Sequence, residues 1–283
     1  MAQRFAEQRR LRRGVAALLV VSYLAYLGWR LTILHPENIL LSAVYWGVEL
    51  LGFLFSLAVI YTSWQHRARD PLPAPAGLTV DVFIPCYREP LPIIRQTLLA
   101  AKAIRYPHRT VMLDDGQSLP PEARAARQQL AAELGVVYLS RPHNTHAKAG
   151  NLNFGLAHST ADFVLVFDAD HIALPQALDV TLGFFTDPQV GLVQTPQDYY
   201  NTQAFQYMNA RNGALWHDQS FFYNIGLPGL DAIEASTCVG TGVVYRRAAL
   251  DQIGGIPTTT VTEDLHTSIK LAKVGLKSVY LNE

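Results

Sequence analysis

The sequence predicts an α/β fold in which a mostly parallel sheet carries helices on both faces, preceded by a two-helix transmembrane hairpin. Two observations predict it. Residues 15–64 are almost free of charge, and beyond them short apolar runs alternate with amphipathic stretches. Such alternation is typical of parallel strands joined by crossover helices. The 283 residues leave room for one large domain and an appendage, and the net charge of zero gives no reason to expect a nucleic-acid partner.

The hairpin is predicted from two long apolar stretches. The first, Val15 to Leu34, is broken only by Arg30 and would span about 30 Å as a helix, which is enough to cross a bilayer. The second, Ile39 to Trp64, contains Glu49, and residues 35–38 form the turn between the two. A charge inside a bilayer is costly unless it is paired, so a helix–helix hydrogen bond is favoured for Glu49 over a polar lining for a translocation path.

The flanking charges predict the orientation of the hairpin. Arginines precede the first span, Arg67 and Arg69 follow the second, and the turn has neither lysine nor arginine. By the positive-inside rule both ends lie in the cytoplasm, so we expect a multi-pass membrane protein. The expected organisation is a basic cytosolic N-terminus (1–14), the hairpin (15–64), a proline-rich linker (65–78) and a cytosolic α/β domain (79–283).

Strands and helices are expected to alternate through the domain. The predicted strands are 78–85, 110–113, 136–139 and 163–167, with another ending at 194. The predicted helices are 92–104, 121–134, 146–158, 175–185 and one that follows residue 262 and runs through 272.

Asp168 and Asp170 follow the buried strand at 163–167 and are the most informative pair in the chain. Two carboxylates at the carboxyl end of a parallel strand can hold a divalent cation such as Mg²⁺ or Mn²⁺. An Asx-type turn is the alternative explanation of this pair.

Three other segments bring charged groups to strand ends or helix starts, and each has an ordinary alternative. Asp114-Asp115-Gly116 could be a turn, Lys148 a solvated side chain rather than a phosphate ligand, and Thr262 before Asp264 a simple helix cap. Together, however, these carboxylates would converge on one edge of the sheet. Like charges gathered there need compensation, which a metal and a phosphorylated ligand would supply.

The order and content of these motifs resemble family 2 glycosyltransferases, most closely the catalytic subunits of bacterial cellulose synthases. The matching segments are residues 84–90 (IPCYREP), 114–116 (DDG), 146–151 (HAKAGN), 167–171 (FDADH), 193–196 (VQTP), 239–242 (VGTG), 246–250 (RRAAL) and 262–264 (TED). The resemblance implies a GT-A type domain beside membrane helices, in a multi-pass protein of the bacterial inner (plasma) membrane whose catalytic domain is cytoplasmic.

The resemblance also implies roles for individual residues. Nucleotide-sugar contacts are implied for Tyr87, Glu89, Asp114, Asp115 and Lys148; metal ligation for Asp168 and Asp170; the role of general base for Asp264; and a position beside the acceptor sugar for Val239, Gly240 and Thr241.

The implied activity is metal-dependent, inverting transfer of a sugar from a UDP-sugar donor, with UDP-glucose expected, to a glycan acceptor that grows into a β-linked polysaccharide of the cellulose type. An accessory synthase subunit is an implied partner. Two alternatives stay open: a non-processive transferase to a lipid carrier, and a non-catalytic nucleotide-sugar-binding fragment.

Two departures from the family pattern bear on this expectation. Val239 stands where the cellulose synthases have cysteine, which leaves the acceptor and the polymer open. The chain ends at Glu283, before the family's Gln-x-x-Arg-Trp motif and later membrane helices, so we expect the domain to be C-terminally incomplete. Cys86 and Cys238 are far apart and are expected to be free thiols.

Overall fold

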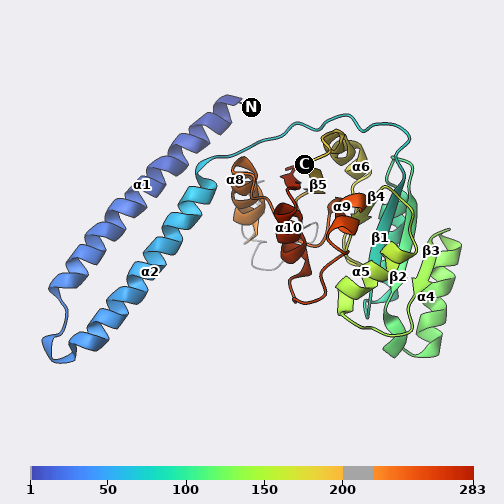
Figure 1. Ribbon diagram of the computed structural model, residues 1–283, viewed down its shortest axis with the longest axis horizontal. Helices are drawn as coiled ribbons and strands as arrows, with labels where there is room; N and C mark the ends of the chain where they lie inside the picture. The colour runs from blue at the N-terminus through green and yellow to red at the C-terminus, as the bar shows by residue number, and fades with distance from the viewer. Residues whose placement is uncertain (1, 200–218) are drawn as a thin grey trace. The chain divides into compact units, whose positions relative to one another are not determined.

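The computed structural model describes residues 2–199 and 219–283, and the chain divides into two compact units, Met1–His66 and Arg67–Glu283 (Figure 1). The first unit is a helical hairpin, formed by α1 (Ala2–Thr32), a short 3₁₀ turn (Pro36–Asn38) and α2 (Ile39–Trp64). Two of its stretches, Arg10–Thr32 and Pro36–Trp64, are long and apolar enough to cross a membrane.

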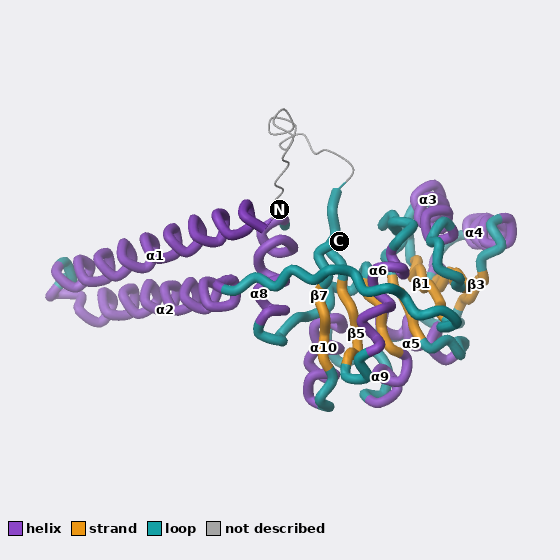
Figure 2. Tube along the Cα trace, turned by 90° about the horizontal axis from the view of Figure 1, so that it is seen from above, coloured by secondary structure: helices purple, strands orange, loops and turns teal. Residues whose placement is uncertain are grey.

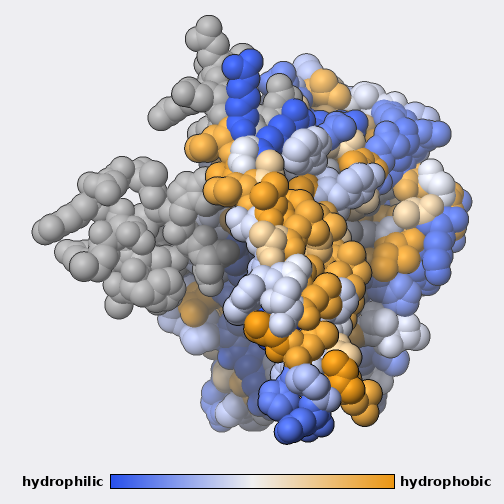
Figure 3. Space-filling view, turned by 90° about the vertical axis from the view of Figure 1, so that its left-hand side faces the viewer, coloured by the Kyte–Doolittle hydropathy of each residue, from blue (hydrophilic) through white to orange (hydrophobic). Residues whose placement is uncertain are grey.

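The surface of the hairpin is apolar along its length. Leu18, Leu40 and Phe55 are each at least 66% exposed, and apolar residues gather over the hairpin between hydrophilic ends (Figure 3). Such a surface is unfavourable in water and suits lipid.

Polar contacts join the two helices across their interface. Glu49 accepts hydrogen bonds from Arg30 Nε at 2.9 Å and from the Tyr26 hydroxyl at 2.8 Å, and Trp46 Nε1 donates to the Leu27 carbonyl at 3.1 Å. The interpretation of Glu49 as a helix–helix bridge is therefore confirmed.

A seven-stranded sheet forms the centre of the second unit, in the order β3-β2-β1-β4-β6-β5-β7. The strands are β1 (Val80–Cys86), β2 (Arg109–Asp114), β3 (Val137–Ser140), β4 (Phe163–Val166), β5 (Val190–Gln194), β6 (Val243–Arg246) and β7 (Lys277–Tyr280). Every neighbouring pair is parallel except those that involve β6, which runs antiparallel to both β4 and β5. The sheet is thus mostly parallel, as predicted.

The reversal of β6 has a direct consequence for the site. Val243, the first residue of β6, pairs with Val166, the last residue of β4. The segment that enters β6 therefore lies at the same edge of the sheet as the segment that leaves β4.

Helices cover both faces of the sheet (Figure 2). One face carries α3 (Leu91–Lys102), α4 (Pro121–Glu133) and α6 (Ala177–Thr181) with the 3₁₀ turn Leu182–Thr186; the other carries α5 (Ala147–Ala157), α9 (Arg247–Gln252) and α10 (Glu263–Lys273). Further short elements are the 3₁₀ turn Gly116–Ser118, the π-helical turn Phe222–Gly226 and α8 (Leu227–Ala232).

The residue pattern explains why these elements pack as they do. In α3, Ile94, Leu98 and Ala101 recur at helical spacing and are fully buried against the sheet. On the other face α5 approaches closely through Gly155, where an added Cβ would lie 2.8 Å from the side chains of Leu113 and Phe83.

The segment expected to be a linker is anchored on the second unit. Arg69 forms an ion pair with the buried carboxylate of Asp231 at 2.7 Å. The backbone of Leu72 lies so close to Gly183 that an added Cβ there would meet the Leu72 carbonyl oxygen at 2.2 Å. Residues 67–78 are therefore packed against the domain that they precede.

Candidate active site

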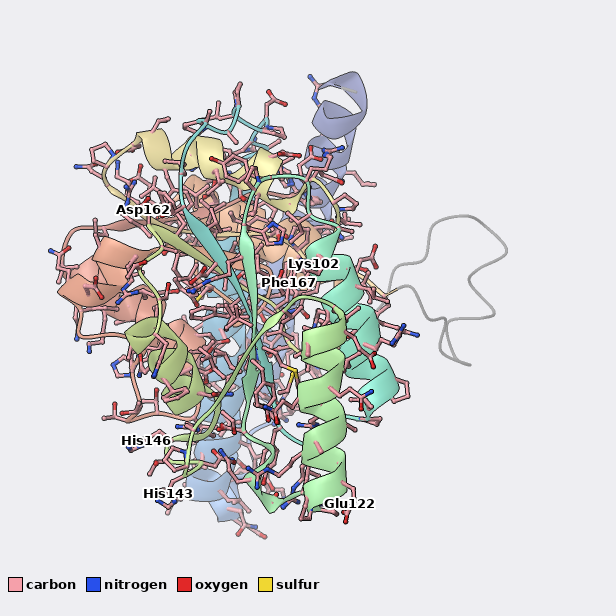
Figure 4. The ribbon with its side chains drawn as sticks, turned by 90° about the vertical axis from the view of Figure 1, so that its right-hand side faces the viewer. Lys102, Glu122, His143, His146, Asp162 and Phe167 are labelled. Atoms are coloured by element: carbon pink, nitrogen blue, oxygen red, sulfur yellow. The ribbon has the colours of Figure 1, made fainter. Side chains whose placement is uncertain are left out.

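The sequence motifs meet at the carboxyl edge of the sheet, around a cavity of about 610 Å³. Figure 4 shows His143 and His146 at this end of the sheet and Asp162, which precedes β4, at the opposite end. The cavity is lined by Pro85, Cys86, Tyr87, Glu89, Asp115, Asn144, Ala147, Lys148, Asn151, Asp168, Ala169 and Asp170. In open α/β sheets ligands bind at this edge.

Asp168 and Asp170 enter the cavity because β4 ends just before them. The Asp168 amide donates to the Thr241 hydroxyl at 3.1 Å, and its carboxylate forms an ion pair with Lys148. The carboxylate of Asp170 contacts His171 Nδ1 at 3.0 Å, and its side chain is 65% exposed.

The two carboxylates fit a divalent cation whose remaining ligands would come from water and a phosphate group. Within residues 2–199 and 219–283 there is no cluster of three or more His, Cys, Asp or Glu side chains that could hold a metal. Mg²⁺ commonly takes one or two carboxylates and completes its shell with water and substrate phosphates. Asp168 and Asp170 supply that number of ligands at the cavity wall.

Lys148 links this pair to the loop before β6. Its ammonium donates to the Gly240 carbonyl at 2.8 Å while it is ion-paired with Asp168. The lysine stands in the first turn of α5, directly after two residues with left-handed backbone, His146 (φ 61°) and Ala147 (φ 43°).

Gln194 holds the loop that precedes β6, residues 239–242, in place. This fully buried side chain donates from Nε2 to the Thr241 carbonyl at 2.7 Å and accepts from the Val239 amide at 2.8 Å. Gly240 has φ +79°, and a Cβ added there would lie 3.3 Å from Lys148 Nζ and 3.4 Å from Asp264 Oδ2. Of the predicted acceptor-side residues, Gly240 therefore lies beside Lys148, while Val239 and Thr241 are held by Gln194.

Asp264 is the second residue of α10 and lies close to Gly240 in the same loop. It does not line the cavity itself but approaches it across Gly240. Thr262 precedes the helix without a side-chain capping hydrogen bond, so the capping explanation of this motif lacks its expected contact. Asp264 is thus close to Gly240, whose carbonyl accepts a hydrogen bond from Lys148, and Lys148 in turn is ion-paired with Asp168.

Asp115 lines the cavity in a tight ion pair. Both of its oxygens accept hydrogen bonds from Arg141, from Nε and from a terminal nitrogen, each at 2.6 Å. Both side chains are less than 8% exposed. This bidentate geometry fixes the carboxylate at the cavity wall.

Asp114 points elsewhere, although it is the adjacent residue. Its carboxylate accepts from Arg127 at 2.6 Å, from the Tyr138 hydroxyl at 2.7 Å and from the Gly116 amide at 3.0 Å, and it does not line the cavity. Burial, together with the hydrogen bond to Asp114, raises the pKa of Tyr138 to about 12. The structure therefore separates the two carboxylates, with Asp115 at the cavity and Asp114 beneath it.

Tyr87 and Glu89 form one rim of the cavity. The Tyr87 amide donates to Glu89 Oε2 at 2.6 Å. Arg127 donates to the carbonyl oxygens of Tyr87 and Glu89 at 3.0 and 2.8 Å while it is paired with Asp114. One buried arginine therefore ties this rim to the end of β2.

Three residues that support the site were given no role by the sequence: Arg127, Arg141 and Gln194. Gln194 belongs to a motif that had been noted, whereas nothing in the spacing of the two arginines distinguishes them from surface charges. Both are less than 8% exposed in the fold.

Cys86 and Cys238 are free, as predicted, and both are buried. Burial raises the pKa of Cys86 well above its ordinary value and that of Cys238 to about 11. Both thiols are protonated at neutral pH, so neither is poised to act as a thiolate nucleophile.

Comparison with known proteins assigns the family. The family model described as Glycosyl transferase family 2 matches residues 81–254. The chain belongs to this family. It is 37% identical to Cellulose synthase 1 of Komagataeibacter xylinus, with 91% of the chain and 17% of that protein covered.

Catalytic subunits of such synthases match as well. The chain is 36% identical to Cellulose synthase 1 catalytic subunit [UDP-forming] of K. xylinus, over 97% of the chain and 38% of the relative. It is 35% identical to the corresponding subunit of Xanthomonas axonopodis pv. citri (strain 306), over 90% of the chain and 36% of the relative. The chain thus spans less than two fifths of the length of these relatives.

Solved structures support the fold. A Pyrobaculum calidifontis mannosyltransferase in complex with GDP-Man and Mn²⁺ matches with a TM-score of 0.59 at 22% identity, covering 87% of this chain and 65% of that one. Staphylococcus aureus TarS 1-349 in complex with UDP matches with a TM-score of 0.51 at 15% identity, covering 73% and 61%. The predicted GT-A type fold and the assignment to the family 2 glycosyltransferases are confirmed.

Proposed function

We propose that this chain carries the catalytic centre of a metal-dependent, inverting glycosyltransferase that moves glucose from UDP-glucose to a growing β-linked glucan of the cellulose type. The observation that carries the proposal is the contact made by Lys148, which joins Asp168 to the Gly240 carbonyl beside Asp264. The residues proposed to bind the donor and the proposed base are therefore close to each other, as a direct displacement requires.

The donor side is proposed to lie in the cavity of about 610 Å³. Tyr87 and Glu89 at its rim and Asp115 at its wall would hold the uracil and ribose, while Asp114 would act indirectly by fixing Arg127 and the rim. The UDP-forming relatives and the UDP complex of TarS support a uridine diphosphate donor.

Asp168 and Asp170 are proposed to hold Mg²⁺ or Mn²⁺ at the diphosphate. A bound divalent ion supplies positive charge that neutralises the charge developing on the leaving diphosphate. Lys148, with its ammonium at the same carboxylate, would add a second positive charge on the donor side.

Asp264 is proposed as the general base. A sugar hydroxyl is a poor nucleophile at neutral pH, so a carboxylate must accept its proton as it attacks. With one base and direct displacement an α-linked donor gives a β-linkage. The segment Val239 to Thr241 would hold the acceptor's terminal sugar, because it lies between Lys148 and Asp264.

The hairpin is proposed to anchor the domain in the bacterial inner membrane with both ends in the cytoplasm. The two apolar helices and the arginines that flank them support this orientation. The cytoplasm would deliver the nucleotide sugar, and an accessory synthase subunit is a proposed partner.

The experiment is UDP release from UDP-glucose by membranes that contain the full chain, with Mg²⁺, with Mn²⁺ and with EDTA. Asp264→Asn is expected to abolish release and leave UDP binding nearly intact, and Asp170→Ala to weaken metal-dependent UDP binding. Asp251→Asn, on the exposed side of α9, is the matched control and should match the unaltered chain.

The outcomes separate the assignments. Loss of UDP binding in Asp264→Asn would refute its role as a base, and unchanged binding in Asp170→Ala would remove it from the metal site. Release of UDP with a single-sugar lipid product instead of a polymer ladder would favour the lipid-carrier alternative. Metal-dependent binding without release would favour a nucleotide-sugar-binding role for these 283 residues.

A further inference from the structure

Arg141 stands directly after β3 and makes five hydrogen bonds with its guanidinium group. Two go to the carboxylate of Asp115, each at 2.6 Å. The others go to the carbonyl oxygens of Thr145 at 2.6 Å and Ala147 at 2.8 Å and to Asn144 Oδ1 at 3.1 Å. A side chain that is only 7% exposed thus contacts the cavity wall on one side and the turn before α5 on the other.

The turn that Arg141 holds is an unfavourable one. His146 (φ 61°, ψ 28°) and Ala147 (φ 43°) are consecutive non-glycine residues in the left-handed region. Such conformations cost free energy and persist only where the surroundings enforce them. Two of the enforcing bonds come from Arg141, to the carbonyls on either side of His146.

Lys148 is the residue that this turn positions. It follows Ala147 directly, and its ammonium reaches both Asp168 and the Gly240 carbonyl. A relaxed turn would move the start of α5 and with it the lysine. Space for the guanidinium is kept by Gly150, where an added Cβ would lie 2.5 Å from an Arg141 nitrogen.

We propose that Arg141 is a positioning residue, which fixes Asp115 and Lys148 relative to each other by bonding the carboxylate and the strained turn with one rigid group. The inference rests on the proposed function, because Asp115 and Lys148 are its donor-side residues. It adds a residue that acts only through these two, since Arg141 itself does not line the cavity.

The contacts at position 141 require the planar guanidinium group of an arginine. A lysine at 141 would keep the positive charge beside Asp115, but its single ammonium cannot donate in parallel to both carboxylate oxygens and also to the carbonyls of Thr145 and Ala147. Arg141→Lys therefore tests the geometry of the contact while preserving its charge.

The test combines two measurements on the full chain in detergent. Hydrogen exchange should rise at least tenfold in residues 143–150 of Arg141→Lys and stay unchanged in the rest of the domain. UDP affinity, measured by calorimetry with Mn²⁺, should fall by roughly tenfold to a hundredfold, the range typical of lost orienting contacts. Arg247→Lys, which alters an arginine paired with Asp251 and the Ser159 carbonyl away from the cavity, is the matched control.

A double-mutant cycle distinguishes positioning from general stability. If Arg141 acts through Lys148, Arg141→Lys should cost much less UDP affinity in a Lys148→Met background than in the unaltered chain. Equal losses in both backgrounds, unchanged exchange at 143–150, or loss of protection throughout the domain would each overturn the proposal. Absence of UDP binding by the unaltered chain would refute the proposed function instead, and the exchange result would still decide the role of Arg141.

Discussion

The buried ion pair of Arg127 and Asp114 allows us to predict how much stability is lost when the arginine is replaced. The two side chains are 3% and 1% exposed, and their closest atoms are 2.6 Å apart. Arg127→Met removes the cation and leaves Asp114 buried with only the Tyr138 hydroxyl and the Gly116 amide. Removing one partner of a buried pair costs about 3–5 kcal/mol, because the other charge stays uncompensated.

The expected loss is large enough to measure by two methods. In urea unfolding followed by circular dichroism, the free energy of unfolding should fall by that amount. For a domain of this size each kcal/mol lowers Tm by about 2–4 °C, so Tm should drop by roughly 6–20 °C. UDP affinity should also fall, because the carbonyls of Tyr87 and Glu89 lose their common donor.

Two further variants decide whether this reasoning holds. Arg127→Met with Asp114→Asn removes both charges and should recover most of the lost stability. Arg105→Met breaks an exposed pair with Asp179, in which Arg105 is 64% exposed, and should cost about 0–1 kcal/mol. A cost for Arg127→Met as small as that of Arg105→Met, or no recovery in the double variant, would refute the buried-charge explanation.

Three other predictions follow from the packing. Gly183→Ala should destabilise the domain by about 1–3 kcal/mol in urea, since its Cβ would meet the Leu72 carbonyl at 2.2 Å, and unchanged stability would mean that the linker is not docked there. Glu49→Ala should weaken the pairing of α1 and α2 by about 0.6–2 kcal/mol, because Arg30 loses its carboxylate partner. The loss should appear as reduced cross-linking between cysteines introduced into the two helices, and undiminished cross-linking would contradict it. Since burial raises the pKa of Tyr138 to about 12, above the ordinary tyrosine value near 10, the folded state holds this proton more tightly than the unfolded state. Its stabilising effect is complete below pH 10 and is lost as pH rises toward 12, so Tyr138→Phe should flatten the alkaline fall in unfolding free energy, and an unaltered slope would refute the linkage.

Much of the second unit, Arg67–Glu283, could be predicted because its elements carry local signals. The buried strand expected at 163–167 is β4 (Phe163–Val166), and the helix expected at 121–134 is α4 (Pro121–Glu133). The helix expected at 175–185 is instead a short α6 followed by a 3₁₀ turn (Leu182–Thr186), a distinction that apolar periodicity does not make.

The direction of β6 could not be predicted. Val243–Arg246 is a short apolar run, and such a run has the same pattern whichever way it enters a sheet. Its direction depends on pairing with β4 and β5, which are far away in sequence.

The candidate site shows the same division between local and distant information. Asp168 and Asp170 could be placed at the sheet edge because they follow a recognisable strand. That Asp115 lines the cavity while Asp114 turns away depends on Arg141 and Arg127, each more than ten residues distant. Buried arginines resemble solvated ones in a sequence, since burial is decided by the elements that close over them.

Because β6 runs antiparallel to β4, two segments that are far apart in the sequence form the two sides of the candidate site. The residues proposed to hold the nucleotide sugar lie between positions 87 and 170, whereas the segment proposed to lie beside the acceptor begins about seventy residues later, at residue 239. The two segments contact each other where Lys148 donates to the Gly240 carbonyl and where the Asp168 amide donates to the Thr241 hydroxyl. Residues 236–242 could therefore be exchanged between related proteins as one segment. Such an exchange would change the residues proposed to contact the acceptor and would keep those proposed to bind the nucleotide sugar.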